Sequence, residues 1–231
     1  MTEWTPKTKL GIMVAKNEIE SIHQVFETGY TIREPEIVDI LIPRMIDQVI
    51  DINMVQRMTD SGRRTNFAVT IVIGNGDGIV GVGRGKAKET GVAIFKAIKA
   101  AKLNIIELKR GCGSWQCGCG ESHTLPYKVV GRNGSVEVTL KPAPKGVGLA
   151  VNDVARPILH LAGISDVWGF SRGHTKTTVN YALAVFDALK KTSLMKVNES
   201  LEHNLKITTG IIGVITLRDD ETKENKNKKR R

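Results

Sequence analysis

Residues 62–88 read GRRTNFAVTIVIGNGDGIVGVGRGKAK and combine paired arginines, alternating apolar residues and spaced glycines. The alternation over residues 66–73 predicts a β-strand. Asn75-Gly76-Asp77-Gly78 follows, and because these residue types accept positive φ it predicts a tight turn. A partner strand is then expected over residues 79–84. This stretch therefore predicts a β-hairpin.

The predicted second strand carries glycine at alternate positions, so one of its faces lacks side chains and lets another backbone or surface approach closely. An amphipathic helix is expected next, over residues 86–103. Its predicted core arc is formed by Ala87, Gly91, Ile94, Phe95, Ile98 and Ala101. Lysines fall on a different arc, where a row of like charges destabilises the helix unless an anion neutralises it. These lysines are Lys88, Lys96, Lys99 and Lys102.

Further elements are expected on both sides of this hairpin and helix. Before it, the pattern predicts helices over residues 17–26 and 35–48, the second broken at Pro43. After it, residues 111–123 form a glycine- and cysteine-rich loop that divides the chain. The second half then predicts a hairpin over 125–130 and 135–140, helices over 152–162 and 177–191, and strands over 166–170 and 207–217.

Length and composition limit the class of protein. The chain has 231 residues and 41% apolar residues, enough for one or two domains with cores. It has no run near the roughly 20 apolar residues that a membrane helix needs, and its first residues lack a signal-peptide pattern. Three cysteines do not suggest a disulfide framework. We therefore expect a cytoplasmic protein without a membrane partner.

The positive charge is concentrated in two short blocks. The formal net charge is +10, and residues 57–110 hold 11 basic and 4 acidic residues. The last ten residues hold 6 basic and 1 acidic residue in a low-complexity segment, which is expected to order only on binding. A basic block inside a folded segment suggests a polyanionic partner, although a solvated basic face has the same composition.

Two glycine-rich segments are compatible with nucleotide binding. Residues 76–81 match GxGxxG, but that motif requires a helix to begin where this sequence predicts a strand. Residues 144–149, PKGVGL, could hold a phosphate before a helix, as in the small-molecule kinases related to galactokinase. The serine hydroxyls usual after that loop are replaced by Ala150 and Val151. A kinase remains the alternative from another functional class.

Four potential metal ligands lie in the glycine–cysteine loop: Cys112, Cys117, Cys119 and His123. This clustering favours a structural zinc site of the Cys₃His type. The spacing C-x4-C-x-C-x3-H lacks the common CxxC pair, so three reduced thiols are the alternative.

Basic residues flank the predicted hairpin where RNA could reach them. Arg63 and Arg64 are expected in a loop before the first strand, and paired arginines make bidentate phosphate contacts. Arg84, Lys86 and Lys88 surround the end of the glycine strand and the start of the helix, where backbone N–H groups also favour anions.

The motifs that carry this arrangement resemble a known family. Gly62-Arg63-Arg64-Thr65-Asn66-Phe67, the turn at residues 73–78 and Val80–Glu89 resemble the signature of small-subunit ribosomal protein five. Pro142–Leu149 and Leu161–Ile164 are similar to its C-terminal domain. The resemblance covers residues 34–192, and the leader and cysteine loop are similar to the archaeal branch.

The resemblance implies an α+β fold. Its first domain is like a double-stranded-RNA-binding α-β-β-β-α domain with a three-stranded sheet, and its second is a βαβ-type domain with a left-handed crossover. The implied organisation is an N-terminal extension (1–34), the first domain (35–110), the Cys/Gly loop (111–123), the second domain (124–213) and a basic tail (214–231).

The resemblance also implies a structural, non-enzymatic constituent of the small ribosomal subunit. It implies binding to small-subunit rRNA, contact with ribosomal protein four and other ribosomal proteins, nearby mRNA at its entry path and a contribution to translational accuracy. The resemblance implies no required cofactor. A structural zinc ion is suggested only by the cysteine and histidine cluster. A free-standing RNA-binding protein outside the ribosome is a further alternative. The predicted rRNA-binding residues are Arg57, Arg63, Arg64, Arg84, Lys86, Lys88, Lys109, Arg110, Arg132, Lys145, Arg172 and Lys176.

Overall fold

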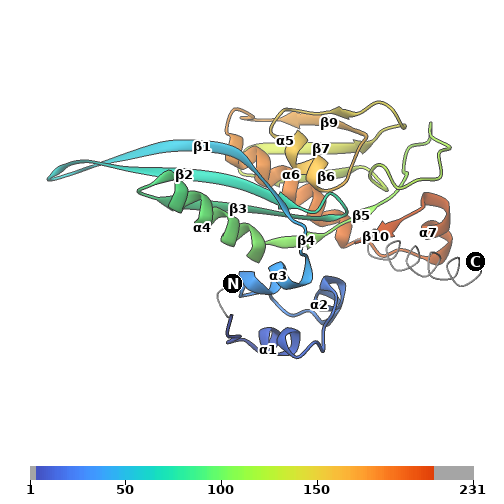
Figure 1. Ribbon diagram of the computed structural model, residues 1–231. Helices are drawn as coiled ribbons and strands as arrows, with labels where there is room; N and C mark the ends of the chain where they lie inside the picture. The colour runs from blue at the N-terminus through green and yellow to red at the C-terminus, as the bar shows by residue number, and fades with distance from the viewer. Residues whose placement is uncertain (1–3, 211–231) are drawn as a thin grey trace, which may run out of the picture.

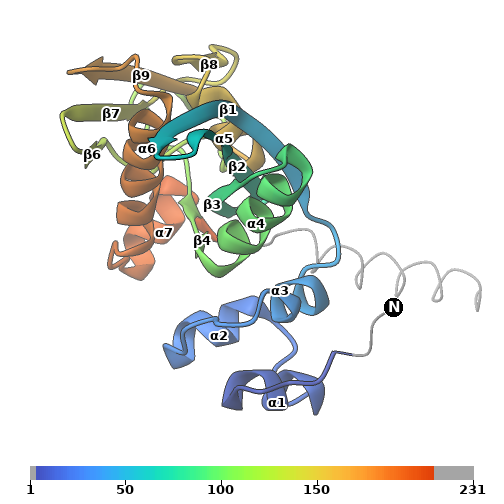
Figure 2. The ribbon, with the colours of Figure 1, turned by 90° about the vertical axis from the view of Figure 1, so that its left-hand side faces the viewer.

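The computed structural model describes residues 4–210, which form three N-terminal helices and two packed α/β units. In Figure 1 the N-terminal helices lie below a long sheet, and the second sheet lies above it. Figure 2 shows from the side that helices α5 and α6 lie between the two sheets. Of the helices between residues 4 and 210, none has the length and apolar character needed to cross a bilayer.

The N-terminal helices are short and have a small core of their own, formed by Leu10, Val14, Ile19, Val25 and Ile37. The side chains of Thr8 and Ser21 cap the first two, and a proline begins the third. The first helix was not predicted, and the helix expected over 35–48 ends before Pro43, as that proline suggested. The helices are α1 (Lys9–Ala15), α2 (Ile22–Thr28) and α3 (Pro35–Leu41).

The first sheet is antiparallel, with strand order β1-β2-β3-β4. Its β1–β2 hairpin extends away from the rest of the molecule (Figure 1). The predicted turn at residues 75–78 is confirmed: the Asn75 side chain accepts hydrogen bonds from the backbone N–H groups of Asp77 and Ile79. The sheet has four strands where three were implied, because a short strand pairs with β3. The strands are β1 (Ile46–Thr59), β2 (Gly62–Gly74), β3 (Ile79–Ala87) and β4 (Ile105–Glu107).

Helix α4 (Thr90–Leu103) lies directly on the side-chain-free face of β3. A Cβ atom added to Gly83 would lie 2.2 Å from the backbone nitrogen of Ala101, and one added to Gly85 would lie 2.3 Å from the carbonyl oxygen of Ala93. The close approach predicted for this face is therefore made by the protein's own helix. This glycine face is buried and offers no surface to RNA.

This contact also corrects the predicted core arc of α4. The buried residues of the helix are Ala93, Ala97 and Ala101, because only small side chains fit against the glycine strand. Phe95, which was assigned to the core, is 69% exposed. The larger apolar residues of the helix lie at the margins of the contact.

The second sheet is mixed, with strand order β6-β7-β9-β8 and a parallel β8–β9 pair. Helix α5 connects this pair, which forms the βαβ unit that the resemblance implied. One core cluster joins this sheet and its helices to Val72, Val80 and Val82 of the first sheet. The elements are β6 (Val129–Asn133), β7 (Val136–Pro142), β8 (Leu149–Ala150), α5 (Ala155–Leu161), β9 (Val167–Arg172) and α6 (Thr178–Ser193).

A small two-stranded sheet closes the described part of the chain. It pairs β5 (Lys109–Arg110) with β10 (Thr208–Thr209), which follows α7 (Glu199–Leu205). The strand predicted over residues 207–217 is therefore present at its start. The remainder of that strand and the basic tail lie outside the described residues.

Candidate nucleic-acid interface and metal site

Four of the predicted RNA-binding residues lie on one face of the β1–β2–β3 segment. Arg57 and Arg64 are directly opposite each other in the β1–β2 register. Arg84 and Lys86 alternate with the buried glycines of β3, so they point to the side away from α4. All four are exposed. We call Arg57, Arg64, Arg84 and Lys86 the basic face.

The second domain borders this face. Asp51 of β1 lies in one row with Thr70 and Arg84, and its side chain accepts a hydrogen bond from the Thr178 hydroxyl at the start of α6. The exposed Lys176 lies two residues before α6. The contact therefore brings the loop that carries Lys176 to the base of the basic face.

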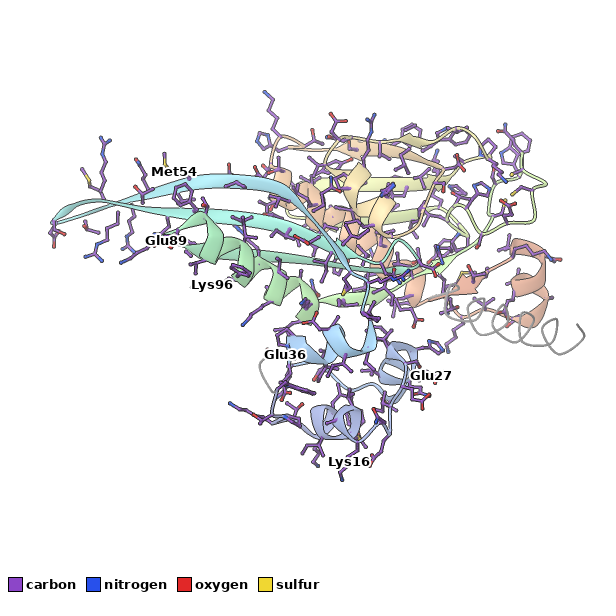
Figure 3. All side chains as sticks on the ribbon, viewed as in Figure 1. Lys16, Glu27, Glu36, Met54, Glu89 and Lys96 are labelled. Atoms are coloured by element: carbon purple, nitrogen blue, oxygen red, sulfur yellow. The ribbon has the colours of Figure 1, made fainter. Side chains whose placement is uncertain are left out.

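A hollow with three lysines adjoins the basic face at the junction of β3 and α4. It has a volume of about 440 Å³, and Lys86, Lys88 and Lys96 line it together with Asn66 and Glu89. Figure 3 shows Glu89 at the start of α4 and Lys96 on this helix, next to the extended hairpin. Lys96 was not among the predicted contacts, although the lysine row on the predicted helix contained it.

Arg63 lies on the opposite face of the hairpin from Arg64. It stands across from Met58, near the end of the hairpin, and is exposed. The expected loop location of both arginines was wrong, because Gly62 to Gly74 form one continuous strand. They nevertheless lie near the outer end of the sheet, where a large ligand can reach them.

Arg110 is a correction to the predicted set. It is 5% exposed, and its guanidinium bonds to Asp77 and to the carbonyl oxygens of Gly163 and Gly210. It therefore ties the β2–β3 turn to the second domain and is not accessible to RNA. Its neighbour Lys109 is partly buried and donates to the carbonyl oxygen of Met195 at 2.5 Å.

The remaining predicted contacts lie away from the basic face. Arg132 and Arg172 stand on either side of Glu137 across the second sheet. They occupy the outer face, since the neighbouring Val136 and Val138 are buried. Lys145 forms an ion pair with Glu121 at 2.6 Å, beside the cysteine loop.

The four predicted metal ligands converge. The sulfur atoms of Cys112, Cys117 and Cys119 and a ring nitrogen of His123 all lie within 4.8 Å of one another. The Cys117 sulfur is 3.6 Å from His123 Nε2, and the Cys119 and Cys112 sulfurs are 3.7 Å apart. Three sulfurs and one imidazole at such separations match the donor set of a structural zinc site.

A buried carboxylate fixes the orientation of His123. Its Nδ1 lies 2.8 Å from Asp166 Oδ2, which leaves Nε2 facing the sulfur atoms. Metal-ligating histidines commonly contact a carboxylate through their second nitrogen in this way. Asp166 lies 43 residues from His123, so the spacing of the cysteine loop could not reveal it.

The environments of two thiols differ. A hydrogen bond from the Lys145 backbone N–H lowers the pKa of Cys117 to about 6. Burial raises the pKa of Cys112 to about 12, and its side-chain hydrogen bonds with Cys119 and Cys117 raise it further. Without a metal ion, therefore, Cys117 is the more readily ionised of these two ligands.

Asp166 also binds the glycine-rich loop at residues 144–149, which suggested a kinase. Its Oδ1 accepts hydrogen bonds from the backbone N–H groups of Gly146 and Gly148, at 3.0 and 2.8 Å. The amides that would bind a phosphate thus already bind a carboxylate of the protein. The GxGxxG segment continues into β3 instead of beginning a helix, so it also lacks the arrangement of a dinucleotide site.

Comparison with known proteins identifies two matching family models. Residues 45–109 match "Ribosomal protein S5, N-terminal domain" and residues 131–201 match "Ribosomal protein S5, C-terminal domain". A Picrophilus torridus protein named small ribosomal subunit protein uS5 is 62% identical over 211 residues, covering 91% of this chain and 96% of the relative. The protein of that name from Thermoplasma acidophilum is 57% identical, covering 91% and 95%. The one from Pyrobaculum arsenaticum is 52% identical, covering 85% and 98%.

Proposed function

The chain belongs to the ribosomal protein S5 family, in its archaeal form, and from this membership we propose that it binds small-subunit rRNA through the basic face. As a member, it is a structural constituent of the small ribosomal subunit and not an enzyme. The kinase and the free-standing RNA-binding protein are therefore set aside. The rRNA contact itself is our proposal.

One observation carries the proposal: four cationic side chains from three strands lie exposed on one face of an extended hairpin. Arg57, Arg64, Arg84 and Lys86 come from β1, β2 and β3, and the hollow with Lys88 and Lys96 continues the charge. Phosphate neutralisation of this kind binds RNA by its backbone and shape. A hairpin that extends from the body can enter a helical junction that a compact surface could not reach.

The salt dependence of rRNA binding tests this contact. We expect Arg57→Gln with Arg64→Gln to weaken binding to small-subunit rRNA and to flatten the plot of log K against log salt by about one to two units, one per lost phosphate contact. The control is Lys9→Gln with Lys16→Gln on the N-terminal helices, which should leave the slope unchanged. An unaltered slope in the arginine variant would rule out phosphate contacts by this pair.

We also propose the finer roles that the family resemblance implies: contact with ribosomal protein four, a position near the mRNA entry path and an influence on decoding accuracy. The edge strand β1 supports a protein neighbour. It exposes Ile52, Met54 and Met58 at 48%, 60% and 71%, and all three lie on the same face of the strand. An exposed apolar edge strand of this length is usually covered by a partner.

Met54→Gln with Met58→Gln tests this apolar stripe. We expect weaker binding to purified ribosomal protein four and an altered misreading rate in a stop-codon reporter, with rRNA affinity unchanged. Tyr30→Gln, at an exposed position on the N-terminal segment, is the matched control. Binding to protein four at the wild-type level would contradict the assignment of β1 to that contact.

A structural zinc ion is the second proposal, held by Cys112, Cys117, Cys119 and His123. The observation that favours it is the buried His123–Asp166 contact, which fixes a nitrogen toward the three sulfurs. Zinc would brace the loop that joins the two domains. It would contribute to folding and not to a reaction.

Metal analysis tests the zinc proposal. We expect about one zinc equivalent in the purified protein, and about 10- to 100-fold weaker zinc binding in Asp166→Asn, which loses the orientation of His123. A chelator should lower the unfolding temperature of the wild type but have little effect on Cys117→Ser. Less than about a tenth of an equivalent of zinc in the wild type would contradict the site.

A further inference from the structure

The outer face of the second sheet carries a hollow lined by aromatic and cationic side chains. Helices α5 and α6 cover the inner face of this sheet, so the outer face lies on the surface of the molecule (Figure 2). The hollow has a volume of about 640 Å³. The aromatic and cationic residues that line it are Trp115, Tyr127, Lys128, Lys141, Trp168 and Phe170.

Two of the four aromatic side chains of this hollow are exposed, and the other two, Tyr127 and Trp168, are half-buried. Trp115 is 90% exposed and Phe170 is 56% exposed. Aromatic residues make up only 5% of the chain, yet two of its three tryptophans line this hollow. Large aromatic side chains contribute most to a core, so their collection on an open surface indicates a ligand.

The two lysines of the hollow accompany the rings. Lys141 Nζ lies 4.7 Å from the centre of the Phe170 ring, and Lys141 is also the cross-strand neighbour of Trp168. Lys128 is exposed at the edge. None of the residues that line the hollow in the described part of the chain is acidic. The ligand is therefore expected to combine negative charge with flat rings.

A hydrogen bond to the backbone of α6 fixes the side chain of Tyr127. Its hydroxyl donates to the carbonyl oxygen of Lys191 at 2.9 Å, and burial raises the pKa of that hydroxyl. The β7–β9 pairing fixes the backbone of Lys141, Trp168 and Phe170. Most of the hollow is thus preorganised, and Trp115 of the cysteine loop completes its lining.

We propose that this hollow binds an unpaired stretch of small-subunit rRNA. Its bases stack on Trp115, Trp168 and Phe170, and its phosphates contact Lys128 and Lys141. Stacking on aromatic side chains beside a cationic groove is the general way in which proteins hold single-stranded nucleic acid. An apolar peptide would bury the two lysines without partners, which is unfavourable. This inference rests on the proposed rRNA-binding function but uses a surface separate from the basic face.

Binding of a single-stranded probe tests the hollow in isolation. With fluorescein-labelled decauridylate, we expect Trp115→Ala with Phe170→Ala to weaken binding by about tenfold or more, because the variant loses two of the rings on which bases stack. Tyr30→Ala is the aromatic control and should bind as the wild type does. Lys128→Gln with Lys141→Gln, which spares the rings, should flatten the salt dependence instead.

A duplex RNA hairpin distinguishes the two proposals. The aromatic variant should bind the duplex as the wild type does, and Arg57→Gln with Arg64→Gln should bind decauridylate as the wild type does. Unchanged decauridylate affinity in the aromatic variant would overturn the proposal for the hollow but would not affect the proposal for the basic face. Loss of duplex binding in the arginine variant bears only on the basic face.

Crosslinking in assembled subunits identifies the occupant. A photoreactive benzoylphenylalanine at position 170 should crosslink to an unpaired segment of small-subunit rRNA. A crosslink to a ribosomal protein, or none from fully incorporated protein, would overturn the proposal.

Discussion

At the residue scale, single glycines set the distance between α4 and the first sheet. Gly81, Gly83 and Gly85 each lie so close to the backbone of the helix that a Cβ would come within 2.5 Å of it. Backbone atoms cannot move aside as a flexible side chain can. The position of α4, and with it of Lys88 and Lys96, therefore depends on the absence of side chains on β3.

We expect Gly83→Ala to destabilise the protein by about 1–3 kcal/mol, because the added methyl group overpacks a close contact. Gly91→Ala is the matched control, since nothing lies within 4 Å of its added Cβ. Alanine is the better helix former, so this control should be neutral or stabilise the protein by up to about 1 kcal/mol. Urea unfolding gives both values. A Gly83→Ala variant as stable as the wild type would show that the helix is free to shift.

Arg110 provides a second residue-scale prediction. We expect Arg110→Met to destabilise the protein by about 1.5–3 kcal/mol, the range for hydrogen bonds that involve a charged group, because it breaks the contacts to Asp77, Gly163 and Gly210. Its affinity for rRNA, measured below the unfolding temperature, should equal that of the wild type. Weaker rRNA binding with unchanged stability would return Arg110 to the RNA-binding set.

At the element scale, the N-terminal helices are attached to the body through side-chain contacts. His23 of α2 bonds to Glu107 of β4 at 2.9 Å, and Lys102 of α4 bonds to Asp39 of α3 at 2.5 Å. These contacts hold the N-terminal helices against β4 and α4. The attachment through His23 depends on its charge.

This dependence predicts a pH effect. The hydrogen bond to Glu107 raises the pKa of His23 above 6.5 in the folded protein. The contact therefore stabilises the protein fully below about pH 6.5, and its contribution is lost as the pH rises through the raised pKa. We expect His23→Gln to lower the urea midpoint at pH 6 but not at pH 9. His174→Gln, in an exposed loop, should show no such difference. An equal effect of His23→Gln at both pH values would exclude a role for the charge.

The elements differed in how far the sequence could reveal them. The β2–β3 hairpin was predictable because its alternation and turn are local. The residue pattern did not predict strand β1, which only the family resemblance implied, because nearly all its residues are exposed and burial imposes no alternating pattern on it. The predicted buried face of α4 was wrong. Large apolar residues usually mark the core face of a helix, but here the face that packs on the glycine strand carries small residues.

The candidate sites show the same limit. The clustering of the four candidate metal ligands was predictable because all of them lie within one loop. Asp166, which orients His123, was not, and neither was the role of Arg110, whose partner Asp77 is 33 residues away. Sequence patterns identified the charged residues of the basic face, but only the strand register shows which share a face. The aromatic hollow comes from separate segments, and no local motif predicted it.

At the scale of the whole molecule, one continuous core joins the two sheets that carry the candidate RNA surfaces. The core cluster that joins Val72 and Val80 to Val138 and Leu140 connects the first sheet to the second. The basic face extends along the β1–β2 hairpin and β3, and the aromatic hollow lies on the outer face of the second sheet. A member of this family with both surfaces in use would hold separate rRNA segments at a fixed distance.

The central claim is that the basic face holds this protein in the small ribosomal subunit. Sedimentation of that subunit tests the claim most directly. The variant replaces Arg57, Arg64, Arg84 and Lys86 with glutamine, and an unfolding temperature equal to that of the wild type shows that its fold is retained. In cell extract at moderate salt, the wild type should travel with the small ribosomal subunit. The variant should be found mainly in the free-protein fractions. A folded variant that sediments with the small subunit as completely as the wild type would contradict the account.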